Sequence, residues 1–172
     1  MTIAIIGHGN VGGALGRHWE QKGHAVVYGS RDLSGASAEQ FRAEHGAQPD
    51  IRTLTEAVRA AEIVLLATPY PAAQEFVAQH AAALAGKVVI DATNPIGPGL
   101  VLTVGHSASG AEELQRRAPG ARVVKAFNTY GWENFRDAAY PGGVPAMFIA
   151  GDDAAACEVV AKLAADIGFR PV

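Results

Sequence analysis

The first seventeen residues place a glycine-rich turn between an apolar strand and a helix. Residues 2–6 read TIAII, which is typical of a short buried strand, and residues 10–22 carry apolar side chains at helical spacing. The turn over residues 7–12 reads GHGNVG and fits the pattern G-x-G-x-x-G. Between a strand and a helix, this pattern indicates a dinucleotide-binding βαβ unit. The alternative is a glycine-rich turn that serves backbone geometry only.

Each glycine of the turn has a physical reason in such a unit. Gly7 permits the tight turn, and Gly12 lets the helix pack closely on the strand. Gly9 leaves the backbone open to a pyrophosphate, because a Cβ atom there would stand in its way. The helix N-terminus then offers free N–H groups and a positive dipole end to the phosphates. The stretch therefore predicts phosphates bound over the start of the helix.

The end of the second strand indicates which dinucleotide is bound. Residues 24–28 read HAVVY and complete the unit, and they are followed by Gly29, Ser30 and Arg31. NAD-binding units carry an acidic residue at this place, whereas a hydroxyl and a guanidinium suit a 2′-phosphate. We therefore predict NADP(H) rather than NAD(H). Two alternatives stay open: Asp32 is the ribose-binding acid displaced along the chain, or Arg31 is a solvated surface charge.

Strand and helix patterns alternate along the rest of the chain. Further helices are expected over residues 36–45, 72–84 and 112–118, after a cap at Thr53 or Thr55, and after a cap at Asp152 or Asp153. Further strands are expected over residues 50–52, 63–67, 87–91, 122–126, 146–150 and 169–172. Unbroken alternation predicts an α/β, Rossmann-type fold with a doubly wound, mostly parallel sheet. A length of 172 residues suits a single domain over residues 1–172.

Polar loops follow three of the buried strands. Thr68, Asn94 and Asn128 each come shortly after a strand ends. Parallel strands present their carboxyl ends at one edge, where ligands bind, so we expect these loops to line one crevice with the glycine turn. The predicted cofactor-binding residues are Gly7, Gly9, Asn10, Val11, Gly12, Ser30, Arg31, Ala67, Thr68, Pro69, Asn94, Pro95 and Ala126.

Four other loop side chains have two readings each. Tyr70 follows a proline at the same edge and either lines the cofactor or packs in the core. Phe127 and Trp132 either stack on a planar ring or belong to the core. His106 lies in a long loop rich in Gly, Ser and Pro, and it either contacts substrate or is solvated.

Composition excludes several classes of function. The net charge of −3 gives no basic field for nucleic acid. The sequence has neither an apolar run of membrane length nor a basic leader, so we expect a cytoplasmic protein without a membrane partner. The single cysteine, Cys157, rules out an intrachain disulfide. The six histidines lack metal-ligand spacing to acidic or cysteine residues, so no metal site is expected.

Taken together, four segments resemble a known family. They are the glycine turn over residues 7–12, GSR over 29–31, TNP over 93–95 and KAFNT over 125–129. The combination is similar to the NADPH-dependent reductases of the coenzyme F420:NADP oxidoreductase type. The likeness spans essentially the whole chain, and residues 125–129 are its most specific part.

The resemblance implies both a cofactor and a reaction. A member would bind NADP(H) through the glycine turn and through Ser30 and Arg31. It would exchange a hydride between the nicotinamide and a stacked deazaflavin (F420) or flavin, and it would form a homodimer. Members usually continue past a strand like residues 169–172 into a segment that helps cover the deazaflavin. We therefore expect this usual C-terminal segment to be absent here.

Direct hydride transfer asks for positioning rather than acid–base chemistry. The reacting carbons must be held at near-attack distance with water kept out. In keeping with this, the sequence suggests no triad and no paired carboxylates, and the catalytic residues stay unassigned. Asn94 and Asn128 are candidates for orienting the reacting rings, and the alternative is that they cap strand-end turns. Two other functions stay open: reduction of a small imine or carbonyl, and an NADP(H)-binding or sensing module without turnover.

Overall fold

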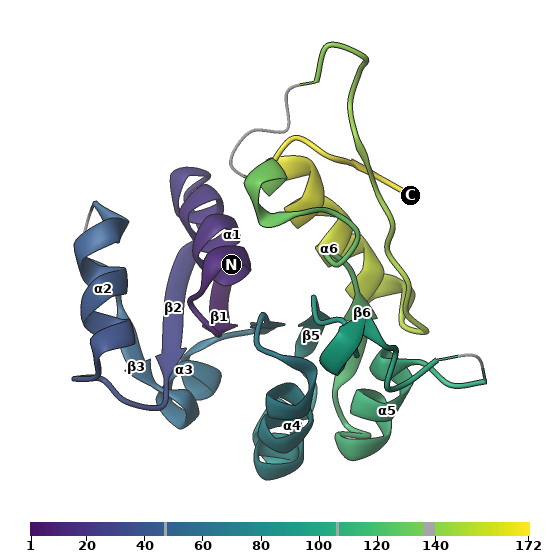
Figure 1. Cartoon of the computed structure of the whole chain (residues 1–172), viewed down its shortest axis with the longest axis horizontal. Coiled ribbons are helices and arrows are strands. Elements are labelled where there is room, and N and C mark those ends of the chain that lie inside the picture. The colour runs from purple at the N-terminus through teal and green to yellow at the C-terminus, as the bar shows by residue number, and fades with distance from the viewer. Residues whose placement is uncertain (47, 106, 136–139) are drawn as a thin grey trace.

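Six parallel strands form the central sheet of the computed structural model, which describes residues 1–46, 48–105, 107–135 and 140–172. The strand order is β3-β2-β1-β4-β5-β6 (Figure 1). The strands are β1 (Thr2–Ile6), β2 (Ala25–Ser30), β3 (Ile51–Thr53), β4 (Ile63–Leu66), β5 (Val88–Asp91) and β6 (Arg122–Lys125). The predicted α/β, Rossmann-type fold with a parallel sheet is confirmed.

Helices cover both faces of this sheet. One face carries α1 (Asn10–Gln21), α2 (Ala36–His45) and α6 (Ala154–Asp166), and the other carries α3 (Leu54–Ala60), α4 (Tyr70–Leu84) and α5 (Gly110–Arg117) (Figure 1). Side chains of a strand alternate between the faces. Accordingly, Ile3 and Ile5 of β1 pack on the α1 side, whereas Ala4 and Ile6 pack on the α3 side. Two 3-10 turns, η1 (Pro98–Leu100) and η2 (Trp132–Phe135), complete the helical elements.

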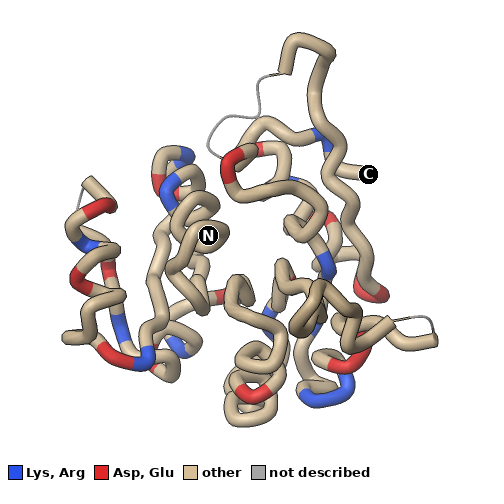
Figure 2. Tube along the Cα trace, viewed as in Figure 1, with Lys and Arg blue, Asp and Glu red and all other residues tan. Residues whose placement is uncertain are grey.

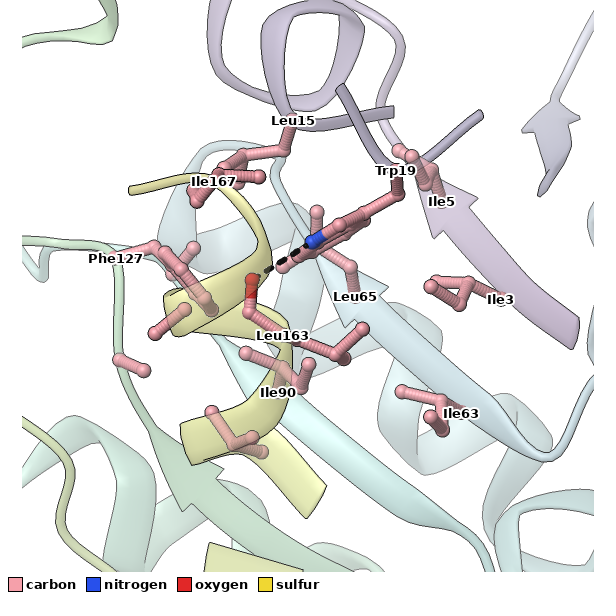
Figure 3. Close-up of a cluster of buried hydrophobic side chains, with 14 of the residues drawn as sticks. Ile3, Ile5, Leu15, Trp19, Ile63, Leu65, Ile90, Phe127, Leu163 and Ile167 are labelled. Carbon is pink, nitrogen blue, oxygen red and sulfur yellow. Dashed lines mark hydrogen bonds between the residues drawn. The ribbon is translucent and has the colours of Figure 1, made fainter. Parts of the chain in front are cut away.

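A buried tryptophan joins the first and last helices. Trp19 of α1 is fully buried, and its indole Nε1–H donates to the Leu163 carbonyl of α6 over 3.1 Å (Figure 3). Its ring meets that of Phe127 edge-on, with 5.7 Å between the centroids. Phe127 is itself buried, which assigns it to the core. The indole is therefore surrounded by groups from distant parts of the chain.

The last two strands do not extend the central sheet. β7 (Ala146–Met147) and β8 (Arg170–Pro171) are shorter than expected and pair in parallel with each other as a separate ribbon. Ala150 instead forms an isolated antiparallel bridge with Lys125, with N–O distances of 2.7 and 3.0 Å. This bridge uses the free edge at the end of β6, so no parallel neighbour continues the sheet there. The predicted strands within residues 146–150 and 169–172 are present and parallel, but the expectation that they extend the central sheet is wrong.

Two helix starts refine the sequence-based expectations. Thr53, not Thr55, caps α3, because its side chain accepts the Glu56 N–H while the Glu56 carboxylate accepts the Thr53 N–H. α4 begins at Tyr70 instead of residue 72, with Pro71 in its first turn. A proline is tolerated there because the first N–H groups of a helix have no partner within it. Tyr70 and Pro71 therefore belong to the helix, and the expected loop ends at Pro69.

Candidate functional site

A cavity of about 440 Å³ opens at the carboxyl edge of the sheet, where the strand order reverses between β1 and β4. Ligands of open α/β sheets bind at such a switch point. The glycine turn, the end of β2 and the start of α4 form its walls. Of the predicted cofactor-binding residues, the cavity brings together Gly7, Gly9, Ser30, Arg31, Ala67, Thr68 and Pro69.

The glycine turn has the geometry that a close-packed phosphate loop needs. Gly7 lies at φ +100°, and a Cβ atom there would come within 2.5 Å of the Ala67 carbonyl oxygen. A Cβ atom on Gly12 would come within 1.9 Å of the Gly7 carbonyl oxygen. A Cβ atom on Gly9 would meet nothing within 4 Å, so this position faces open space. The turn is thus closed on its inner side and accessible on its outer side.

The turn leads into a helix end without a side-chain cap. Gly9 is the N-cap of α1 and offers no side chain to its N–H groups. The next residues, Asn10 and Val11, are exposed and half-buried, while Gly12 is buried. The first N–H groups of a helix have no partner within it and carry partial positive charge. This end of α1 therefore suits an anion.

At the end of β2, the local bonds separate Arg31 from its acidic neighbour. The Asp32 carboxylate accepts the N–H and the hydroxyl of Ser34, both at 3.0 Å, and these bonds lower the pKa of Asp32. Ser30 donates its hydroxyl to the Asp32 carbonyl over 2.8 Å. Arg31 is exposed, and no hydrogen bond from its guanidinium is found among the described residues. The geometry favours Arg31 over Asp32 as the group available to a ligand.

Positive charge at the site is local. Figure 2 shows the Lys and Arg positions scattered along the backbone among Asp and Glu positions. Arg31 and Asp32 both line the cavity, together with Glu75 of α4. The affinity of this cavity for an anionic ligand would therefore depend on a few contacts near Arg31.

Two side chains between β4 and the first turn of α4, Thr68 and Tyr70, face different surroundings: Thr68 faces the cavity and Tyr70 faces the core. Thr68 lines the cavity, and its Oγ1 is buried without a hydrogen-bond partner among the described residues. Tyr70 points away from the cavity: its hydroxyl donates to the Glu113 carboxylate over 2.9 Å and lies 3.3 Å from the Gly110 carbonyl. Burial and the Glu113 carboxylate raise the pKa of Tyr70 to about 12. Tyr70 therefore packs in the core and anchors α5, whereas Thr68 has bonding capacity left for a ligand.

Asn94, Pro95 and Asn128 line a second cavity, of about 830 Å³. The expected single crevice is therefore divided into two cavities. Asn94 Nδ2 donates to the Asn128 carbonyl over 3.1 Å, and Asn128 Nδ2 donates to Asn94 Oδ1 over 3.2 Å. Ala126 is fully buried and lines neither cavity. His106 lies outside the described residues, and Trp132 packs partly buried against the core.

Several residues that line the first cavity were not predicted from the sequence as cofactor-binding residues. Ala72, Glu75, Phe76 and Gln79 form one face of α4. Their spacing of three and four residues was the available signal, but it is equally typical of a core-facing stripe. His8 was missed although it lies inside the glycine motif.

The His8 ring stacks on the Phe41 ring of α2, with 5.0 Å between the centroids and 9° between the planes. Burial lowers the pKa of His8, and the nearby Arg42 guanidinium lowers it further. The unfolded chain takes up a proton at the ordinary histidine pKa of about 6.5, whereas the folded chain does so only at lower pH. His8 therefore makes the free energy of unfolding fall as the pH drops below this value.

This linkage predicts a measurable pH effect. Between about pH 7.5 and about pH 5.5, we expect the free energy of unfolding to fall more in the native chain than in His8→Gln. Urea titrations at both pH values measure the difference. The two proteins differ only at position 8, so the difference between them isolates the contribution of His8. An equal fall in both proteins would show that His8 does not contribute.

The described part of the chain shows neither a metal cluster nor a membrane-spanning helix. Within residues 1–46, 48–105, 107–135 and 140–172, no three His, Cys, Asp or Glu side chains lie close enough together to hold a metal ion. In the same ranges, no helix has the length and apolar character to cross a bilayer.

Comparison with known proteins gives consistent matches. Residues 2–95 match the family model described as NADP oxidoreductase, coenzyme F420-dependent. An F420-dependent NADP reductase from Methanothermobacter thermautotrophicus is 32% identical over 190 aligned positions, which cover 100% of this chain and 80% of the relative. A crystal structure of a candidate F420-dependent NADP reductase from Arthrobacter sp. FB24 superposes with a TM-score of 0.89 at 31% identity, covering 98% of this chain and 82% of that one.

A more distant structure shares the fold alone. The pyrroline carboxylate reductase of Plasmodium falciparum, with NADP bound, superposes with a TM-score of 0.69 at 11% identity. The match covers 100% of this chain and 57% of that enzyme. The superposition supports the Rossmann-type architecture. Because the sequence identity is so low, it carries no argument about the substrate.

Proposed function

Because this chain belongs to the family of coenzyme F420-dependent NADP oxidoreductases, we propose that it transfers a hydride between NADP(H) and coenzyme F420. The observation that carries the proposal is the cavity at the strand-order switch, which is walled by the glycine turn, Ser30 and Arg31. The family relationship supports hydride transfer to or from F420. The cavity supports NADP(H) as the dinucleotide.

Three features of the cavity fit NADP(H). The open space at Gly9 leaves room for a pyrophosphate, which would lie against the free N–H groups at the start of α1. Arg31 has unused donors for the 2′-phosphate, and Ser30 adds a hydroxyl beside it. The unpartnered Oγ1 of Thr68 would gain a hydrogen-bond partner on the bound dinucleotide.

The chain's own groups would contribute binding and orientation. The bound nicotinamide and deazaflavin supply the hydride chemistry, so the protein has to hold the two reacting carbons together and keep water away. Asn94 and Asn128 offer amide donors and acceptors at the second cavity, where they would orient the acceptor.

A spectroscopic assay tests the proposal. With NADPH and oxidised F420, the chain is expected to bleach the deazaflavin absorption band and the nicotinamide band together. FMN, FAD and a ferric chelate serve as competing acceptors, and we expect no NADPH oxidation with any of them. Tight NADPH binding without turnover of any acceptor would instead support an NADP(H)-binding or sensing module.

A further inference from the structure

The strands β5 and β6 end in a buried ion pair. Asp91 and Lys125 are register partners, and Lys125 Nζ lies 3.0 Å from Asp91 Oδ2. The Asp91 side chain is completely buried, and that of Lys125 is 22% exposed. A buried ion pair contributes little net stability compared with apolar residues of similar size, because both charges lose their hydration. The position of this pair therefore calls for another reason.

The pair fixes the turn that follows β5. Asp91 Oδ1 accepts the Thr93 N–H over 2.9 Å and the Thr93 hydroxyl over 2.6 Å. The Lys125 ammonium also donates to the Thr93 carbonyl. Thr93 is thus held at its amide, its hydroxyl and its carbonyl. The next residue is Asn94, so the place where this side chain leaves the backbone is determined by Asp91 and Lys125.

The turn that follows β6 is fixed as well. Phe127 lies at φ +61°, in the left-handed region that residues with a Cβ atom seldom adopt, and its N–H donates to Met147 Sδ over 3.3 Å. This conformation brings Asn128 back toward Asn94, with which it exchanges the two hydrogen bonds described above. Asn94, Lys125 and Asn128 all line the second cavity. Backbone strain of this kind is found where function requires a particular geometry.

We propose that Asp91 and Lys125 are positioning residues for hydride transfer, because they clamp the turn that presents Asn94 to the acceptor, and Asn94 is in turn hydrogen-bonded to Asn128. The inference rests on the proposed function, which supplies the acceptor. Asp91 holds Thr93 directly and also holds Lys125, which binds the Thr93 carbonyl. Neither residue would touch the reacting atoms; both would affect the rate only by positioning the two asparagines. The clamp lies at the second cavity, away from the glycine turn and Arg31.

Single-turnover kinetics test this role. With NADPH and F420 both saturating, Lys125→Met is expected to slow hydride transfer on the order of 100-fold, since a misplacement of about 1 Å can cost that much. NADPH binding should change less than about 3-fold, because the first cavity is lined by other residues. Lys125→Arg keeps the charge and is expected to recover part of the lost rate.

A matched control and a double variant separate positioning from folding. Lys87 lies at the opposite end of β5, and its Nζ donates to the Ala61 carbonyl over 2.5 Å. Lys87→Met removes a comparable lysine contact and should leave the hydride-transfer rate unchanged. The double variant Asp91→Asn/Lys125→Met removes both buried charges, so it should refold stably yet remain slow.

A readout without turnover completes the test. In the ligand-free protein, the side-chain NH₂ resonances of Asn94 and Asn128 should shift or broaden in Lys125→Met but not in Lys87→Met. An unchanged hydride-transfer rate with unchanged resonances in Lys125→Met, or full recovery of the rate in the double variant, would overturn the positioning role. A native chain that never reduces F420 would instead refute the proposed function, and the positioning role with it.

Discussion

Replacing Gly12 by alanine is expected to destabilise the fold and abolish NADPH binding. The new Cβ atom would lie 1.9 Å from the Gly7 carbonyl oxygen, which is backbone and cannot rotate away as a side chain could. Overpacking of this kind costs about 3 kcal/mol or more when backbone must move. For a chain of this size, that loss lowers the Tm by roughly 6–12 °C. Thermal unfolding by circular dichroism and an NADPH titration measure the two effects.

Gly9→Ala is the matched control for this prediction. Its Cβ atom would meet no protein atom within 4 Å, so the free energy of unfolding should change by less than about 0.5 kcal/mol. The methyl group would nevertheless occupy the open space proposed for the pyrophosphate, and NADPH affinity should fall at least about 10-fold. Loss of stability in both variants, or in neither, would contradict the distinction between the inner and outer sides of the turn.

Replacing Arg31 by alanine is expected to weaken NADPH binding selectively. A charged hydrogen bond contributes about 1.5–3 kcal/mol, so the dissociation constant for NADPH should rise by roughly 10- to 150-fold. NADH lacks the 2′-phosphate, and its affinity should stay nearly constant. Because Arg31 is exposed, the difference should shrink as the ionic strength rises. Fluorescence titrations with both dinucleotides at two salt concentrations measure the effect.

Arg59 provides the control for Arg31→Ala. It is an exposed arginine of α3 that does not line the cavity. Arg59→Ala should leave the affinities for both dinucleotides unchanged. If Arg31→Ala weakened NADPH and NADH equally, Arg31 would have no role in binding the 2′-phosphate.

Local sequence signals predicted the dinucleotide-binding half well. The turn over residues 7–12 and the helix over residues 36–45 depend on glycine conformation and short-range periodicity, which can be read within a dozen residues. The placement of residues 146–150 depends on distant partners: Ala150 pairs with Lys125, which lies 25 positions earlier in the chain. No pattern within residues 146–150 shows that this pairing replaces a sheet extension.

The candidate site was predicted less completely. The sequence indicates which loops lie at the carboxyl edge of the sheet, but it does not indicate how far apart they lie along that edge. Thr68 and Asn128 both lie at the carboxyl edge, as expected. They follow β4 and β6, which are two strands apart, and neighbouring strands are spaced by about 4.8 Å, so the two turns are separated by roughly 10 Å. That separation puts them in different cavities. The tie between Asp91 and Lys125 escaped prediction because the two residues are 34 positions apart.

The hydrogen bond between Trp19 and Leu163 has a consequence for synthesis on the ribosome. The two residues are 144 positions apart, so at 5–20 residues per second roughly 7–30 s separate their translation. During that interval α6 is not yet available to cover Ile3, Ile5 and the indole. The glycine turn, although translated first, acquires its complete supporting core only after α6 has been translated.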